Sequence, residues 1–310
     1  MGCCFFDLST KILRQENIFH RNMVTGNFIF NGNPLTAKNV PHWGMSLLKA
    51  GSMRFRWNEQ NENRHNFLER VASMSSTSLT PVSIELIHSK TVFTLNCESE
   101  SQNKQGDGII TKNQHLMPTV TVADCMPIFL YDIKSGCFGA LHSGWKGTGI
   151  IQTAIEKACQ EFCSEVQNIC VVLGPHIGPC CYIIDEERAE YFSRNFCKEC
   201  IEFVEKAELS SSAIPQWSAD CKKLYRLSLA KANLAILKAL GVPEKNIAVC
   251  NDCTCCTTFA DNTENSEKNA KSSHIYGSFR RQTAFLPENS KIEERWKHFT
   301  VQAAFCGYLF

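Results

Sequence analysis

Residues 119–149 read TVTVADCMPIFLYDIKSGCFGALHSGWKGTG, and this stretch decides most of the fold and of the candidate site. The ADC triplet follows an apolar, β-branched run, and HSGWKGTG follows a second apolar run, GCFGAL. Both runs predict strands that end in turns, because β-branched residues favour strands and glycine favours turns. Cys125 and His142 therefore each lie at the end of a predicted strand, and neighbouring strand ends can direct both side chains into one cleft.

A third candidate ligand, His88, closes the run SIELIH, which also predicts a strand. Together with Cys125 and His142 it would form a Cys-His-His set. Three protein ligands with one open position are typical of a catalytic zinc site, whereas structural zinc sites are closed by four ligands. Pro127 is expected to stop the strand ladder and to give the thiolate a rigid position. The alternative for each of the three ligands is an ordinary buried side chain.

The composition excludes several classes of protein. The chain has 310 residues, 44% of them hydrophobic and 20% charged, as in ordinary soluble proteins. Lys+Arg of 32 against Asp+Glu of 31 gives no field for nucleic acid, so we expect no nucleic-acid partner. No apolar stretch reaches the length of a membrane span, and the start MGCCFFDLST has no secretory pattern. We therefore expect a cytoplasmic protein whose 18 cysteines are mostly reduced.

The pattern of elements predicts a mixed α/β fold, because strands alternate with helices without the regular period of a doubly wound sheet. An Asn-Gly pair in NFIFNGNPL predicts a hairpin. Periodicity and capping residues predict helices at 58–74, 150–163, 186–194 (capped by Asp185) and 221–240 (capped by Asp220).

Three motifs carry a resemblance to a known family. ADCMPI at 123–128, HSGWKGTG at 142–149 and LGPHIGPCCY at 173–182 stand in this order in the chain. In order and spacing they resemble the multicopper-oxidase-like laccase-domain family, which includes purine nucleoside phosphorylases of the YlmD/YfiH type. The resemblance covers about residues 42–307. It divides the chain into a variable N-terminal segment, 1–40, and one laccase-like domain, 41–310.

The resemblance implies a fold, an activity and a metal. The fold is a single four-layer αββα sandwich with mixed β-sheets. The activity is phosphorolysis of adenosine, inosine, guanosine and S-methyl-5'-thioadenosine to the base and ribose-1-phosphate (or its methylthio analogue), with deamination of adenosine. The partners are then purine nucleosides and phosphate. The cofactor is zinc, with copper as the alternative, and the metal ligands, which are also the catalytic residues, are His88, Cys125 and His142.

Three basic residues would hold phosphate or ribose under the same resemblance. Lys146 follows Trp145 in HSGWKG, Arg280 lies in YGSFRRQ, and Arg64 belongs to an Asn-Arg pair that family members bring to the site. Arginine offers a planar fork that matches phosphate oxygens. Each of these residues taken alone is more often a solvated surface charge. Leu48 and Arg54 stand where family members carry arginine and asparagine, so substrate contacts on that wall are expected to differ.

Two other functions remain open from the sequence. The first is a copper-dependent polyphenol oxidase at the same site; true multicopper oxidases need paired His-x-His motifs, and the nine histidines here include none. The second is a catalytically degenerate family member that binds metal and serves as a scaffold. The retention of all three metal ligands argues against this second function. Cys253, Cys255 and Cys256 lack the spacing of a zinc knuckle, so we expect them to serve packing.

Overall fold

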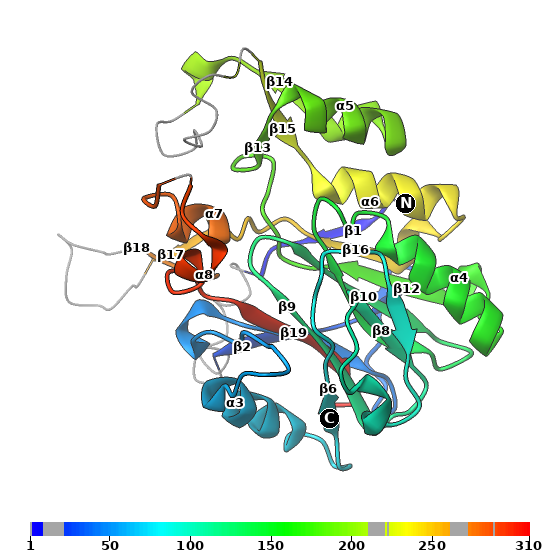
Figure 1. The fold of residues 1–310 in the computed structure, drawn as a ribbon. Coiled ribbons are helices and arrows are strands. Elements are labelled where there is room, and N and C mark those ends of the chain that lie inside the picture. Colours follow the sequence, from blue (N-terminus) through cyan, green and yellow to red (C-terminus); the bar gives the residue numbers. More distant parts are fainter. Residues whose placement is uncertain (1, 9–21, 210–220, 222, 261–271, 288) are drawn as a thin grey trace.

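The protein is a four-layer sandwich with two facing β-sheets inside and helices outside (Figure 1). The computed structural model describes residues 2–8, 22–209, 221, 223–260, 272–287 and 289–310. Apolar side chains point from both faces of each sheet, so each sheet needs a cover on both sides. The predicted αββα architecture with mixed sheets is confirmed.

The larger sheet has seven strands and supplies most of the site. Their order is β1 (Cys4–Phe6), β16 (Ile247–Cys250), β12 (Ile169–Leu173), β10 (Met126–Asp132), β11 (Phe138–Ser143), β8 (Gly108–Thr111) and β7 (Val92–Thr94). β10 is antiparallel to both β11 and β12, whereas β12 is parallel to β16. Every residue of β10, β11 and β12 is buried, as in a strand covered on both faces.

The smaller sheet has five strands and faces the first. Their order is β2 (Met23–Asn27), β5 (His42–Ser46), β19 (Gln302–Gly307), β9 (Leu116–Val122) and β6 (Thr80–Val82). The core between the sheets contains large side chains such as Trp43 and Phe129, whose rings stack 5.5 Å apart. The segment 1–40 contributes β1 to one sheet and β2 to the other; its variability stays a prediction.

Helices cover the two outer faces. α4 (Ile150–Phe162) and α6 (Leu229–Ala239) pack on the seven-stranded sheet, in one core with α5 (Glu186–Asn195). α3 (Glu62–Ala72) covers the five-stranded sheet through Phe67, Leu68 and Val71, the apolar face that the sequence predicted. Asp185 caps α5 as predicted, since its side chain accepts the N–H of Arg188. None of the described helices is both long enough and apolar enough to cross a bilayer.

The remaining elements are short. The strands outside the two large sheets are β3 (Ile29–Phe30), β4 (Asn33–Pro34), β13 (Ile183–Ile184), β14 (Ile201–Val204), β15 (Leu224–Leu227), β17 (Thr258–Ala260) and β18 (Ser272–His274). The helices are α7 (Phe279–Gln282), α8 (Ile292–Arg295) and the 3-10 turns η1 (Leu48–Ala50), η2 (Glu98–Ser101), η3 (Val166–Asn168), η4 (Lys198–Cys200), η5 (Lys206–Glu208) and η7 (Glu244–Asn246). β3 and β4 form the hairpin predicted at the Asn-Gly pair.

Two predicted elements are wrong. The expected helix 221–240 is divided: β15 pairs with β13 and β14, and α6 begins later, capped by Ser228. Asp220, its expected cap, lies outside the described residues. The run 84–88 is no strand; Glu85 makes only an isolated bridge to Gln105. A short apolar run was the only signal for it, and such a signal does not distinguish a strand from a buried loop.

Candidate metal centre and substrate cavity

Cys125 and His142 come together at one edge of the seven-stranded sheet. β9 ends at Val122 in one sheet and β10 begins at Met126 in the other, so Cys125 lies in the turn that joins the two layers. His142 lies at the end of β11, directly opposite Pro127 of β10. The expectation that Pro127 stops the ladder is therefore wrong. Pro127 is the second residue of β10 and pairs with His142 despite its missing N–H.

His88 reaches the same place from a loop. Its backbone has a φ of 58°, in the left-handed region, and its N–H donates to Oδ1 of Asp107 at 3.0 Å. The imidazole rings of His88 and His142 have centroids 4.9 Å apart. A long-range hydrogen bond to a buried carboxylate, rather than a strand end, thus positions this imidazole.

Asp107 is a site residue that the sequence reasoning missed. Its Oδ1 also accepts a hydrogen bond from Nδ1 of His142 at 2.9 Å, and its Oδ2 accepts the hydroxyl of Ser89 at 2.7 Å. The carboxylate is fully buried and its partners are engaged, so it orients ligands rather than offering a free oxygen. The signal that could have found it is the sequence Gly-Asp-Gly at 106–108, which puts an acid between two glycines just before a buried strand.

Cys125 faces His142 closely. The thiol is near enough to that imidazole to raise its pKa. A Cβ added to Gly144 would lie 2.8 Å from Sγ of Cys125 and 3.8 Å from Cε1 of His142. The glycine of the HSGW motif is therefore required for the thiol and the imidazole to approach each other.

The electrostatics of the cluster favours the protonated, positively charged imidazole of His142. Burial alone would lower the pKa of His142, but the neighbouring Cys125 and Asp107 raise it to about 10. Desolvation would raise the pKa of Asp107, yet its hydrogen bonds with His142 and Ser89 hold it below the usual value. Desolvation and the charge of His142 lower the pKa of His88, so that imidazole is neutral near pH 7.

These residues fit a borderline metal such as zinc. Atoms of His88, Asp107 and His142 that could bind a metal lie within 4.8 Å of one another, and Cys125 adjoins His142. Because Asp107 accepts the proton on Nδ1, Nε2 is the ligand atom of His142, and a bound metal would replace the proton that Nε2 carries in the cationic imidazole. A thiolate with two imidazoles, one oriented by a buried carboxylate, is the chemistry of a zinc or copper site.

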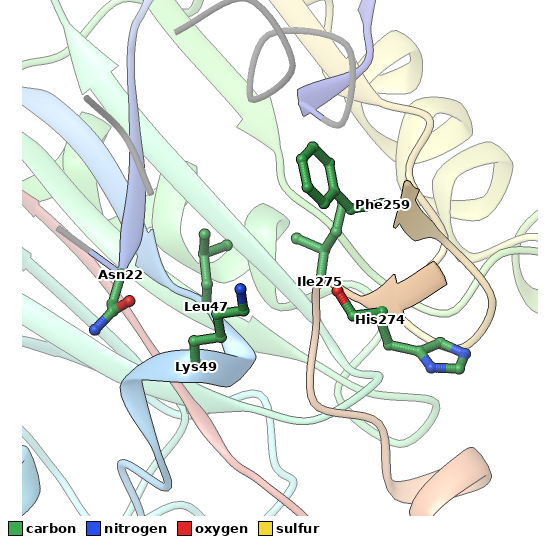
Figure 2. Close-up of a pocket in the computed structure, with 7 residues that line it drawn as sticks. Asn22, Leu47, Lys49, Phe259, His274 and Ile275 are labelled. Atoms are coloured by element: carbon green, nitrogen blue, oxygen red, sulfur yellow. The ribbon is translucent and has the colours of Figure 1, made fainter. Parts of the chain in front are cut away.

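A large cavity opens beside this cluster. It has a volume of about 1550 Å³, and its wall includes His88, Cys125 and His142 as well as the aromatic rings of Trp145 and Tyr182. A second hollow, lined by Leu47, Phe259 and neighbours (Figure 2), holds about 10 Å³, which is room for roughly one water molecule. Only the first of these two can take a nucleoside.

Two of the three predicted basic residues line the cavity. Lys146 is exposed there beside Trp145. The backbone N–H of Arg280 donates to Asp124 at 2.6 Å, and its Nη2 donates to the carbonyl of Ile183 at 3.3 Å. Nη1 of Arg280 is buried with no hydrogen-bond partner among the described residues. Desolvation lowers the pKa of this guanidinium.

Arg64 is placed elsewhere. It is buried under α3, where its Nη1 donates to the carbonyl of Met53 at 3.1 Å and its Nη2 to the hydroxyl of Ser83. It is not among the described residues that line the cavity. Another arginine, Arg188, lines the cavity and was not predicted from the sequence. Its guanidinium lies 4.5 Å from the ring centre of Trp145.

A sequence model of the family described as multi-copper polyphenol oxidoreductase laccase matches residues 50–260, about two thirds of the chain. The chain belongs to this laccase family. Its solved neighbours include YfiH of Bacillus licheniformis, with a TM-score of 0.65 at 21% identity over 86% of this chain and 92% of that one. YlmD of Geobacillus stearothermophilus gives 0.62 at 21% identity over 88% and 93%. These structures show the same fold.

Relatives of this laccase-family chain carry enzyme names. A purine nucleoside phosphorylase of Clostridium acetobutylicum is 41% identical over 100 residues, which is 32% of this chain and 42% of the relative. The purine nucleoside phosphorylase YlmD of Geobacillus stearothermophilus is 31% identical over 152 residues, 48% and 51%. The adenosine deaminase RL5 of an unknown prokaryotic organism is 30% identical over 161 residues, 51% and 56%. The chain spans about half the length of these curated relatives.

Proposed function

We propose that this protein is a metal-dependent purine nucleoside phosphorylase, with adenosine deamination as a second activity of the same site. The proposed substrates are adenosine, inosine, guanosine and S-methyl-5'-thioadenosine. The observation that carries the proposal is that the imidazoles of His88 and His142, the thiol of Cys125 and the side chain of Arg280 belong to residues that line one large cavity. The names of the relatives support the substrate class.

His88, Cys125 and His142 would hold the metal, which we propose to be zinc. Oδ1 of Asp107 holds the imidazole of His142 through its Nδ1 and the backbone of His88 through its N–H. When bound, zinc supplies Lewis-acid polarisation of an oxygen ligand in its open position. The chain's own contribution is a fixed ligand geometry, since Asp107 is fully buried and Cys125 lies in the short connection between β9 and β10.

Arg280 and Lys146 would hold phosphate. Both residues line the cavity, and Nη1 of Arg280 is a buried donor without a hydrogen-bond partner among the described residues. A rotation of the guanidinium would bring this donor to a phosphate oxygen. In phosphorolysis a phosphate oxygen forms a bond to C1′ of the ribose while the C1′–N9 bond breaks and the purine leaves with that electron pair. Fixed cations that hold the phosphate near the sugar contribute through positioning and electrostatics.

Trp145 and Tyr182 would receive the base. Both rings line the cavity, and Arg188 over Trp145 and Arg280 over Tyr182 stabilise their orientation. A purine can stack on such faces, because offset stacking of aromatic rings is favourable.

The experiment is incubation of the zinc-loaded protein with adenosine, with and without phosphate, followed by chromatography of the products. Adenine and ribose-1-phosphate that form only with phosphate support phosphorolysis. Inosine that forms without phosphate supports deamination. Oxidation of catechol by copper-loaded protein, with no nucleoside converted, would instead favour the polyphenol oxidase named in the family description. Inactivity in both assays would favour a metal-binding scaffold.

A further inference from the structure

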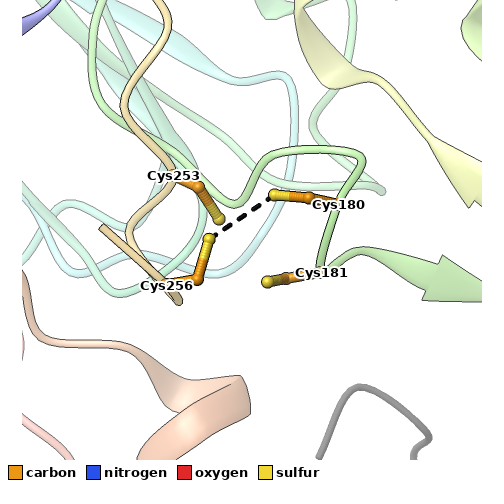
Figure 3. Close-up of side chains that lie close together, drawn as sticks. All are labelled: Cys180, Cys181, Cys253 and Cys256. Carbon is orange, nitrogen blue, oxygen red and sulfur yellow. Dashed lines mark hydrogen bonds between the residues drawn. The ribbon is translucent and has the colours of Figure 1, made fainter. Parts of the chain in front are cut away.

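Four cysteine side chains from two distant segments meet beside the cavity (Figure 3). Cys180 and Cys181 come from the turn after β12, and Cys253 and Cys256 come from the turn after β16. The spacing of Cys253, Cys255 and Cys256 predicts a role in packing. The structure brings Cys253 and Cys256 next to Cys180 and Cys181, although Cys180 and Cys256 are 76 positions apart in the sequence.

The sulfur positions are those of a tetrathiolate metal site. All four Sγ atoms lie within 4.8 Å of one another, and those of Cys180 and Cys256 are 3.6 Å apart. With Zn–S bonds of about 2.3 Å, the edges of a tetrahedron of sulfurs measure about 3.8 Å. Closing a metal between these sulfurs therefore needs only small side-chain movements.

The backbone holds the two turns against each other. β12 and β16 are parallel neighbours, so both turns leave the same edge of the sheet. The N–H of Thr254 donates to the carbonyl of His176 at 3.0 Å, and the N–H of Gly178 donates to Sγ of Cys253 at 3.1 Å. A Cβ on Gly178 would lie 3.2 Å from Cβ of Cys253 and 3.3 Å from Sγ of Cys180. Gly178 thus leaves the space in which the thiols converge.

A basic side chain lies beside the four sulfurs. The guanidinium of Arg281 lies next to the cluster, where its Nη1 donates to the carbonyls of Thr254 and Cys255 at 2.9 and 2.7 Å. A cation so close offsets part of the excess charge that four thiolates would place around a divalent metal.

We propose that Cys180, Cys181, Cys253 and Cys256 form a second, structural metal site that takes zinc. Soft thiolates select zinc over harder divalent ions such as magnesium and calcium. Four protein ligands leave no open position, so this site clamps two turns of the cavity wall and does no chemistry itself. Cys180 and Cys256 are exposed, which gives the metal a path of entry. The proposal does not depend on the proposed function.

The test is zinc content and X-ray absorption of the purified protein and of three variants. Cys125→Ala should lose the first site and keep one zinc per chain, surrounded by four sulfurs at about 2.3 Å. The double variant Cys180→Ser/Cys256→Ser should bind one zinc less than its parent and keep a mixed nitrogen and sulfur shell. The control Cys97→Ser/Cys163→Ser changes two exposed cysteines outside the cluster and should retain the zinc of its parent.

Several results would overturn the proposal. One is a folded Cys125→Ala protein, checked by circular dichroism, that carries no zinc. Another is a Cys180→Ser/Cys256→Ser protein with undiminished zinc. A third is a disulfide between two of the four cysteines in protein purified under reductant. If wild type and Cys125→Ala hold the same single tetrathiolate zinc, this inference stands and the first metal site fails.

Discussion

The carboxylate of Asp107 accepts a hydrogen bond from Nδ1 of His142 at 2.9 Å, and the same oxygen accepts the backbone N–H of His88 at 3.0 Å. One buried oxygen therefore aligns two of the three proposed metal ligands, one through its ring and the other through its backbone. This arrangement makes the geometry of the site depend on a residue that need not touch the metal.

Replacement of Asp107 by Asn should weaken metal binding. The amide keeps the shape but loses the charge that orients the imidazole of His142. We therefore expect the zinc affinity of the site formed by His88, Cys125 and His142 to fall roughly 10- to 100-fold. Chelator competition measures this in the Cys180→Ser/Cys256→Ser background, where a second site cannot contribute. Ser89→Ala removes one bond to Asp107 but spares the bond to His142, and should have a smaller effect. An unchanged affinity in Asp107→Asn would contradict the role.

Arg280→Lys should weaken apparent phosphate affinity although the charge is kept. Lysine cannot retain the bond to the carbonyl of Ile183 and also present a second donor in the planar geometry of Nη1. We expect the KM for phosphate to rise roughly tenfold, in line with a lost charged hydrogen bond of about 1.5 kcal/mol. Arg194→Lys, on the exposed surface of α5, is the matched control. Equal phosphate dependence in wild type and Arg280→Lys would remove Arg280 from the site.

Arg64→Leu should change stability and leave phosphate binding alone. The substitution leaves the carbonyl of Met53 and the hydroxyl of Ser83 without their buried donor, at a cost of about 1–3 kcal/mol. Urea unfolding measures the loss, and the KM for phosphate should stay at the wild-type value. A raised KM without a change in unfolding would return Arg64 to the substrate site.

The 18 cysteines should react as thiols. All of them are free in the structure, and a chain of this length can bury enough surface without disulfides. Alkylation in denaturant with a chelator but no reductant, followed by intact-mass analysis, should modify nearly all of them. If most resisted until reductant was added, the prediction of reduced cysteines would be wrong.

The sequence predicted the parts of the site that local patterns encode. The strand ends at Cys125 and His142 follow from apolar runs that stop at small residues, and α3 follows from its apolar face. The strand predicted at His88 is wrong, because the backbone there has a φ of 58°. This conformation is held by Asp107, a partner 19 positions away that no local pattern reveals.

Arg64 shows how a resemblance can mislead. It lies on the same face of α3 as Phe67, Leu68 and Val71, at the helical spacing of three, four and seven residues. Helical periodicity therefore predicts a side chain that points inward, in contrast to the role in substrate binding that the Asn-Arg motif implies. The four-cysteine cluster could not be predicted, because it depends on the parallel pairing of β12 with β16.

The most direct test of the account is phosphorolysis of adenosine by metal-free protein titrated with zinc, beside Cys125→Ala treated in the same way. The account predicts that phosphate-dependent release of adenine rises with zinc in the wild type and saturates as the site of His88, Cys125 and His142 fills. It also predicts that folded Cys125→Ala stays inactive at every zinc concentration. A wild-type rate in Cys125→Ala, or a rate in the wild type that zinc does not change, would contradict it.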